Sequence, residues 1–251
     1  MRLEERRTLI VLLVAGAVGA VVFMPAVYFF GLWLAPPRPV PETTPAPGVI
    51  REALWARADG GRATELRPIN PVNFIQHRVC RVLAARQDDP AVRGERRAEC
   101  LKQLPAIQGI DYLSGLHMRD NQVAPGFREA ISQFATAAWL TRSWTKASLL
   151  DTMAARGDFG YGWRGITAAS RGYFGRSAEE LTVTQSAMLA SRLGETRTDP
   201  WCEPDAAAGM GDRILARMFE NGAITQAGYA EARSARLDLA PPPEGRSPCK
   251  S

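Results

Sequence analysis

Histidine and cysteine are scarce in this chain, and neither forms a pattern that holds a metal ion. The 251 residues contain two His and four Cys, with no CxxC and no HExxH sequence. No GxGxxG follows a strand-like run, and no GxxxxGK[ST] is present. These absences argue against a built-in zinc site and against the common nucleotide-binding folds, so we expect neither a metal nor a cofactor.

The chain also lacks the low hydrophobicity of a disordered protein and any strong excess of one charge. Hydrophobic residues make up 46% and charged residues 23%, which is typical of a globular protein. With 31 Lys and Arg against 26 Asp and Glu, the net charge is +5. This modest excess is compatible with an anionic partner but does not identify one.

A single long uncharged segment stands near the N-terminus. Residues 8–34 contain no Asp, Glu, Lys or Arg, and as a helix they would measure about 40 Å, against roughly 30 Å for the hydrocarbon core of a membrane. Arg2, Arg6 and Arg7 precede the segment, so residues 1–7 are expected to stay in the cytoplasm. A cleaved signal peptide, the alternative, has a shorter apolar region. We predict a single-pass anchor in the inner membrane, with the rest of the chain in the periplasm and no nucleic acid as partner.

The cysteines would then meet an oxidising compartment, where disulfides form. Cys80, Cys100, Cys202 and Cys249 allow three pairings, and four free thiols are the alternative. We predict the pairs Cys80–Cys100 and Cys202–Cys249, because each joins neighbours in the sequence and closes a segment that is otherwise weakly held.

The chain beyond the anchor divides into three parts. Residues 35–48 contain six prolines and are predicted to form a semi-rigid, extended tether. Residues 49–239 are predicted to form the globular domain. Residues 240–251 are a polar tail.

Helical periodicity dominates the domain, and strand-like alternation is nowhere sustained. Apolar residues recur at helical spacing within residues 75–83 and residues 131–139. Residues 177–180 and 182–185 match the pattern of a helix-capping box. We therefore predict an all-α domain. Residues 105–127 differ, because scattered Gly, Pro and Asn indicate a long loop of the kind that often carries function.

An ungapped run of motif residues stands in the second half of the domain, and a closing motif follows it. The positions are Thr145-Lys146, Leu149-Leu150, Phe159-Gly160, Gly165-Ile166, Ala168-Ala169, Tyr173-Phe174-Gly175, Leu181, Ala187 and Leu189-Ala190, then Arg213, Met218, Gly222 and Ile224-Thr225. This run resembles the later motifs of the peptidoglycan glycosyltransferases of glycosyltransferase family 51. They are the glycan-polymerising domains of class A penicillin-binding proteins and their monofunctional relatives.

The resemblance implies a lysozyme-like helical head, a smaller membrane-proximal jaw and lipid II as the substrate, held by its pyrophosphate. The family's reaction joins disaccharide units and releases undecaprenyl pyrophosphate. Such chemistry needs a carboxylate that takes the proton from the acceptor hydroxyl, and cations that stabilise the departing pyrophosphate. The family supplies one Glu in an EDxxFxxHxG motif, a second in RKxxE, and a GGSTxxQQ loop.

Neither carboxylate of the family is found at its expected position. Counting back from Lys146 without a gap places Gln133 at the RKxxE glutamate. The best match to FxxH is Phe74 and His77, which places Asn70 at the other glutamate. An amide cannot act as a base, so the catalytic site is predicted to be degenerate at Asn70 and Gln133. The GGSTxxQQ loop is absent as well.

Several side chains that can bind an anion remain. Lys146 occupies a position that helps bind phosphate in the family, and Arg164 and Arg171 lie in the next motif. Together with His77, they are the candidates for substrate binding. The alternative is a solvated surface charge for each cation, and a cap or a buried hydrogen bond for His77.

Three functions are compatible with this pattern. The favoured one is a catalytically degenerate scaffold or regulator of cell-wall assembly or of an envelope machine, which binds a peptidoglycan precursor, a glycan strand or an envelope protein. The second is an active, divergent glycosyltransferase that polymerises lipid II with a carboxylate from Asp111, Glu95 or Glu99. The third is a structural module that anchors the wall. The sequence leaves open whether the chain is an enzyme.

Overall fold

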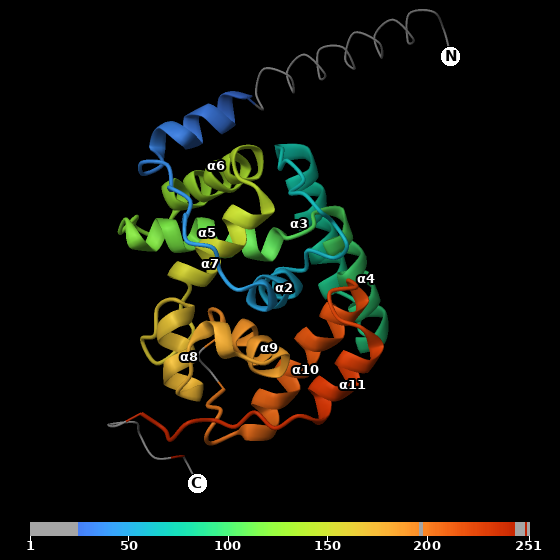
Figure 1. Cartoon of the computed structure of the whole chain (residues 1–251). Helices are drawn as coiled ribbons and strands as arrows, with labels where there is room; N and C mark the ends of the chain where they lie inside the picture. The colour runs from blue at the N-terminus through green and yellow to red at the C-terminus, as the bar shows by residue number, and fades with distance from the viewer. Residues whose placement is uncertain (1–24, 196–197, 244–248, 250–251) are drawn as a thin grey trace, which may run out of the picture.

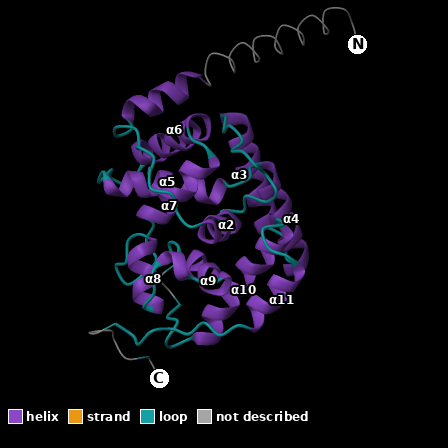
Figure 2. Cartoon of the chain, in the orientation of Figure 1, coloured by secondary structure: helices purple, strands orange, loops and turns teal. Residues whose placement is uncertain are grey.

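The computed structural model describes residues 25–195, 198–243 and 249, and each regular element among them is a helix (Figures 1 and 2). The all-α prediction is therefore confirmed for this part of the chain. After a helical segment at residues 25–34, the elements are α2 (Gly48–Arg57), α3 (Pro71–Ala85), α4 (Pro90–Gln103), α5 (Ile107–Asp120), α6 (Phe127–Ser143), α7 (Lys146–Arg156), α8 (Ile166–Phe174), the 3-10 helix η1 (Ala178–Glu180), α9 (Val183–Arg192), α10 (Pro204–Glu220) and α11 (Gln226–Ser234).

Helix α2 lies at the centre of the domain, and α5, α7, α9 and α10 pack around it (Figure 1). Ala53, Leu54, Trp55 and Ala56 are each no more than 1% exposed. Two of these residues are alanines, which allow the neighbouring helices to approach closely at native packing density. The half-buried residues of α2, such as Arg51 and Arg57, are therefore attached to a backbone that the core holds in place.

Two short helices begin at the caps that the sequence predicted. The Thr182 Oγ1 accepts from the N–H of Gln185 at 3.2 Å, and the Gln185 side chain accepts from the N–H of Thr182 at 3.1 Å. Ser177 and Glu180 form the same reciprocal pair at η1. Each box satisfies backbone donors that the first turn of a helix leaves without a partner.

The prediction of a long loop at residues 105–127 is wrong, because most of these residues form α5. The two glycines inside the helix serve packing. A Cβ on Gly109 would lie 2.9 Å from the Cβ of Ala58, and one on Gly115 would lie 3.3 Å from Nε2 of Gln133. Glycine weakens an isolated helix, but here it permits close contacts that outweigh the local preference.

Helix α3 forms where its apolar periodicity predicts a helix, yet much of its apolar stripe faces outward. Val79, Val82 and Leu83 are 52%, 53% and 49% exposed. The helix packs against α4, and the disulfide Cys80–Cys100 joins the two. Periodicity thus identified the helix but not what covers it.

The proline-rich residues run along the domain surface and contact it (Figure 1). The N–H of Glu42 donates to Oγ1 of Thr152 at 2.9 Å, and the N–H of Ala46 donates to Oδ1 of Asp151 at 2.9 Å. Both acceptors belong to α7. The segment is therefore fixed to the domain by backbone hydrogen bonds.

The predicted membrane anchor lies only partly within the described residues. Residues 1–24 are outside them, and residues 25–34 form a helix that packs against α6. A Cβ on Gly31 would lie 2.7 Å from the Cβ of Ala135, so glycine is needed for this contact. Within the described ranges, no helix has both the length and the apolar character needed to cross a membrane.

The four cysteines form the two predicted disulfides, Cys80–Cys100 and Cys202–Cys249. The first closes a loop across the α3–α4 hairpin. The second attaches residue 249 to the segment just before α10. Both bonds fasten elements that lie outside the α2-centred core. Such cross-links stabilise a protein mainly by restricting its unfolded chain.

The turn after α2 yields a stability prediction. The Nε1 of Trp55 donates to the carbonyl oxygen of Gly61 at 2.9 Å, and a Cβ on Gly60 would overlap the Trp55 ring. We expect Gly60→Ala to lower the free energy of unfolding by about 1–3 kcal/mol through overpacking. The matched control is Gly48→Ala, because a Cβ there meets nothing within 4 Å. Chemical denaturation of both variants measures the difference, and equal midpoints would contradict the steric account.

Candidate functional site

Lys146 begins α7, and its ammonium group lies against the indole of Trp55 in α2. The Oγ1 of Thr145 caps α7 by accepting from the N–H of Ser148 at 3.1 Å. The Nζ of Lys146 lies 4.3 Å from the centroid of the Trp55 ring, within the range of a cation–π interaction. Because Trp55 is buried, helix packing fixes where this positive charge stands.

A hollow of about 620 Å³ opens beside this pair, and we call it the Lys146 hollow. The charged residues that line it are Arg51, Glu52, Glu65 and Lys146, together with Thr64, Leu66, Trp144, Thr145, Ala147 and Leu150. The carboxylate of Asp151 already neutralises Arg51, at 2.7 Å from Nε and 2.8 Å from Nη2. One ammonium and two carboxylates remain, which suits a polar ligand such as a sugar better than a polyanion. The volume is typical of a small-molecule site.

Gln133 lies on α6 and contacts α5. Its Nε2 donates to the backbone carbonyl oxygen of Asp111 at 3.3 Å. A glutamate here would place an acceptor against an acceptor, since a carboxylate has no hydrogen to donate. The amide is therefore matched to its surroundings in a way that a charged carboxylate is not.

Asn70 and His77 hold structural positions on α3. The Oδ1 of Asn70 accepts from the N–H of Asn73 at 2.9 Å and caps the helix, and Asn70 itself is exposed. The buried His77 has its Nδ1 2.9 Å from the carbonyl oxygen of Cys100, which ties α3 to α4. Neither residue lines the Lys146 hollow.

Arg164 and Arg171 lie outside the Lys146 hollow as well. The Nη1 of Arg164 is 3.1 Å from Asp120, and the Nη2 of Arg156 is 2.7 Å from the same carboxylate. Arg171 is exposed near the end of α8. Of the three cations that the sequence grouped together, Lys146 lines this hollow, and Arg164 and Arg171 do not.

A second hollow, of about 300 Å³, lies at the C-terminal end of α2, and we call it the Asp111 hollow. Its lining residues are Arg57, Ala58, Arg81, Gln108, Gly109, Asp111, Tyr112, Met153 and Leu193. Asp111 is one of the alternative carboxylates predicted from the sequence, and Gln133 binds the backbone of the same residue. Glu95 and Glu99, the other two, are exposed on α4 and line neither hollow.

The polar groups of the Asp111 hollow are held in place by neighbours. Arg57 donates to Oε1 of Gln108 at 3.1 Å and to the carbonyl oxygen of Leu193 at 3.3 Å, and burial lowers its pKa. The hydroxyl of Tyr112 accepts from the N–H of Asp158 at 2.8 Å, and burial raises its pKa. These hydrogen bonds fix the guanidinium group of Arg57 and the hydroxyl group of Tyr112 on the wall of the hollow.

Sequence reasoning missed Arg57, Gln108 and Tyr112. The signal available was Arg57 itself, a charged residue inside the otherwise apolar and small stretch from Ala53 to Ala58. A lone arginine in a buried helix needs partners, but those partners come from α5 and from the segment after α9. Only the fold brings these three segments together.

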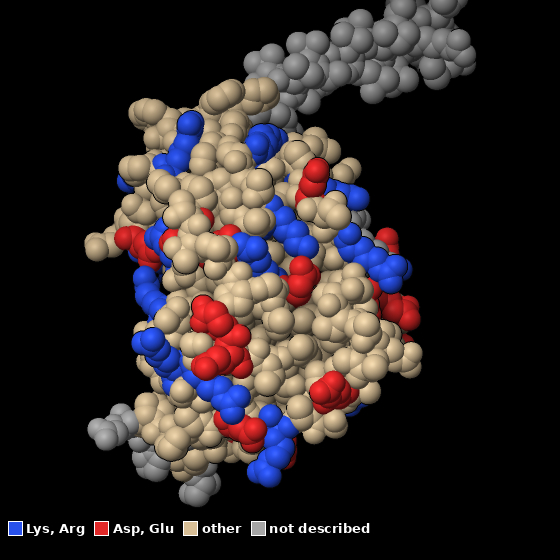
Figure 3. All heavy atoms as spheres, viewed as in Figure 1, with Lys and Arg blue, Asp and Glu red and all other residues tan. Residues whose placement is uncertain are grey.

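The surface charge on one face of the domain is mixed. On the face shown in Figure 3, Lys and Arg alternate with Asp and Glu, and no large area of one sign is seen. Within the described ranges, no group of three or more His, Cys, Asp or Glu side chains is placed to hold a metal ion. This face therefore presents no extended area of one charge that would steer an ion toward it.

Comparison with known proteins identifies part of the chain. Residues 116–219 match the model of the transglycosylase family. Penicillin-binding protein 1A of Rickettsia felis is 33% identical over 101 residues, which are 40% of this chain and 13% of that protein. The protein of the same name from Mycolicibacterium smegmatis is 35% identical over 89 residues, or 35% of this chain and 11% of the relative. A biosynthetic peptidoglycan transglycosylase from a Marinomonas species is 44% identical over 62 residues, covering 25% of this chain and 28% of the relative.

The resemblance seen in the sequence is confirmed over this stretch, so the chain contains a transglycosylase-type domain segment. The stretch runs from α5 to α10 and includes Gln133, Lys146, Arg164 and Arg171. The matched part is a small fraction of each relative, about an eighth of the penicillin-binding proteins and about a quarter of the Marinomonas protein.

His117 lies near the ion pairs that Arg156 and Arg164 form with Asp120, and its surroundings shift its pKa. Burial lowers the pKa of His117, and the charge of Arg156 adds to this effect. A hydrogen bond to the backbone of Pro37 and the carboxylate of Asp120 oppose it. Because the pKa in the folded state is below the usual 6.5, the unfolded chain binds a proton that the folded chain does not in the window just under that value.

This difference predicts the pH dependence of stability. Since the unfolded state binds more protons in that window, the free energy of unfolding rises as the pH increases toward 6.5 and falls as the solution is acidified. We expect His117→Gln to flatten this rise, because glutamine does not titrate. Denaturant unfolding at several pH values from about 5 to about 7 measures the slope. A slope unchanged in the variant would show that His117 is not its source.

Proposed function

We propose that this chain is a membrane-anchored, catalytically degenerate relative of the peptidoglycan transglycosylases. In this proposal it binds a glycan strand or a peptidoglycan precursor and serves as a scaffold or regulator in cell-wall assembly. The observation that carries the proposal is the amide of Gln133, which donates to the carbonyl oxygen of Asp111. The ungapped count from Lys146 assigns this residue to the RKxxE glutamate of the family.

Loss of the base follows from the chemistry of the amide. Polymerisation needs a group that takes the proton from the acceptor hydroxyl, and a neutral amide nitrogen cannot take it. Losing a general base alone lowers a rate by roughly 10²–10⁴-fold. In the motif that begins at Lys146, Met153 and Ala155 stand where the family pattern has Tyr and Asn, so several parts of the site would need to be restored together.

Binding has a better physical basis than catalysis. Lys146 retains its ammonium group, its position is fixed against Trp55, and the Lys146 hollow offers Glu52 and Glu65 as acceptors for hydroxyl groups. A sugar with hydroxyl and amide groups can use both signs of charge. The segment around Lys146 also lies within the stretch that is similar to peptidoglycan transglycosylases.

One observation favours an active, divergent glycosyltransferase as the second candidate. Asp111 lines a hollow together with Tyr112 and two arginines, Arg57 and Arg81. A carboxylate there could take a proton, and the guanidinium groups could stabilise a negative leaving group. This reading requires Asp111 to replace both family glutamates.

The proposed location is the inner membrane, with the domain in the periplasm. The uncharged residues 8–34 support the anchor, and Phe29, Phe30 and Trp33 within them are 65%, 46% and 75% exposed, as expected of residues that meet an apolar environment. The two disulfides fit an oxidising compartment. Thiol trapping of protein taken directly from cells should label none of the four cysteines, whereas full labelling would contradict this location.

Two assays test the function. With purified full chain in detergent and labelled lipid II, we expect no glycan polymer above background. Binding of lipid II or soluble glycan strands should be saturable and about tenfold or more weaker in Lys146→Ala, because a charged hydrogen-bond donor is lost. Arg236→Ala is the control, since Arg236 is 92% exposed and lies outside the hollow.

The outcomes separate the candidates. Robust polymerisation by the wild-type chain that is abolished in Asp111→Asn would establish the divergent enzyme. Equal binding by the wild type and Lys146→Ala would remove the Lys146 hollow from the proposal. Gln133→Glu is expected to leave polymerisation at background and to destabilise the contact with α5, because the new carboxylate would face the carbonyl oxygen of Asp111.

A further inference from the structure

The helix at residues 25–34 carries no charged residue and lies along α6 (Figure 1). The two helices are antiparallel. A Cβ on Gly31 would lie 2.7 Å from the Cβ of Ala135, and the carbonyl oxygen of Leu34 accepts from Nε of Arg128 at 3.3 Å. One face of this short helix, which we call the 25–34 helix, is therefore occupied by the domain.

The opposite face of the 25–34 helix is aromatic and exposed. Phe29 and Trp33 are 65% and 75% exposed, and their spacing of four residues places them on one side of the helix. Each lies two residues from Gly31, or about 200° around the helix, so this side points away from α6. Phe30 is 46% exposed, and its ring stacks on that of Trp33 with 5.9 Å between the centroids. Adjacent exposed aromatic rings of this kind mark a surface that meets an apolar partner.

An arginine stands at each end of the 25–34 helix. The guanidinium group of Arg142 lies over the ring of Tyr28, 5.4 Å from its centroid, and Arg128 binds the last residue of the helix. Among the described residues, neither arginine has a carboxylate at ion-pair distance. Helices that lie in a membrane surface have this arrangement, because the arginines stay among the lipid phosphates while the aromatic face enters the lipid.

The residues before the 25–34 helix are long enough to cross a membrane without it. Residues 8–24 contain no charged residue and number seventeen, at the short end of the range of about 17–25 that spans a hydrocarbon core. Pro25 has no N–H to donate to a preceding turn, which permits a change of direction there. If the 25–34 helix crossed the membrane, α6 beside it would carry Arg142 into the hydrocarbon at the level of Tyr28, where an arginine is costly.

We propose that the 25–34 helix lies flat in the membrane surface, with Phe29, Phe30 and Trp33 in the lipid and α6 on its other side. This inference rests on the membrane location proposed above and adds that the spanning segment ends before Pro25. The partner of the aromatic face is phospholipid, and the guanidinium groups at the two ends of the helix stand at the level of its phosphates. The domain is thus seated on the bilayer through its own packed helix.

Two nitroxide labels test the orientation of the helix. Ala26→Cys and Trp33→Cys are both at exposed positions, and residues seven apart share one side of a helix and lie about 10 Å apart along its axis. The four native cysteines are paired, so each label attaches to the new thiol. With full chain in vesicles of phosphatidylethanolamine and phosphatidylglycerol, electron paramagnetic resonance compares collisions with oxygen and with a water-soluble nickel complex. We expect both labels at the same depth, just below the phosphates. A difference in depth of about 10 Å would show that the helix continues the span and would overturn the proposal.

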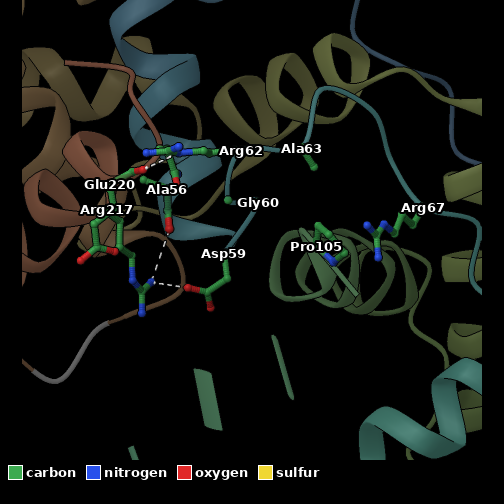
Figure 4. Close-up of a pocket in the computed structure, with 11 residues that line it drawn as sticks. Ala56, Asp59, Gly60, Arg62, Ala63, Arg67, Pro105, Arg217 and Glu220 are labelled. Atoms are coloured by element: carbon green, nitrogen blue, oxygen red, sulfur yellow. Dashed lines mark hydrogen bonds and ion pairs between the residues drawn. The ribbon is translucent and has the colours of Figure 1, made fainter. Parts of the chain in front are cut away.

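Glu220→Cys is the control. Glu220 is exposed at the end of α10, beside the turn that follows α2 (Figure 4), and its label should collide freely with the nickel complex. If the chain stays with the vesicles but the labels at 26 and 33 are as accessible to the nickel complex as the label at 220, the aromatic face is not in lipid. That result would overturn this proposal and leave the anchor in place. A chain that does not float with the vesicles would contradict the membrane location itself, and this proposal with it.

Discussion

The burial of helix α2 is the constraint on which the rest of the structure depends. With residues 53–56 sealed in the core, polar groups next to the helix must find partners inside the protein. Arg51 meets Asp151 of α7, and Arg57 meets Gln108 of α5. The Lys146 hollow and the Asp111 hollow are each lined by residues of α2 and by residues of the helices that bury it. The candidate sites of this domain are therefore arranged around the ends and edges of α2.

Much of the fold follows from local chemistry. Apolar spacing, the capping boxes at Ser177 and Thr182, and the cysteine positions are properties of short segments, and the structure agrees with them. Helix α5 could not be read in the same way, because its glycines lower helix propensity and are justified only by the closeness of Ala58 and Gln133. The exposure of the apolar face of α3 could not be predicted either. Periodicity tells which residues share a face of a helix, but not what that face contacts.

The residues of the candidate site also differ in how far the sequence could predict them. Lys146 and Gln133 could be assigned to positions of the family pattern, because the number of residues between them equals that in the pattern. Asn70 rested on two matching residues, and the structure gives it the role of a helix cap. The grouping of Arg57, Asp111 and Tyr112 depends on a helix end and the helix that crosses it, two segments about fifty residues apart in the chain. No local pattern records such a meeting.

The contacts of residues 25–46 with the domain have a consequence for how its surfaces are displayed. Gly31 sits close on Ala135, and the backbone of Glu42 and Ala46 is bonded to α7. A domain on a flexible linker samples many orientations, and a partner that binds one of them must overcome a cost in rotational entropy. Here folding has already removed that freedom. Residues 25–46 therefore hold the domain and its hollows in a fixed orientation relative to the helix at residues 25–34.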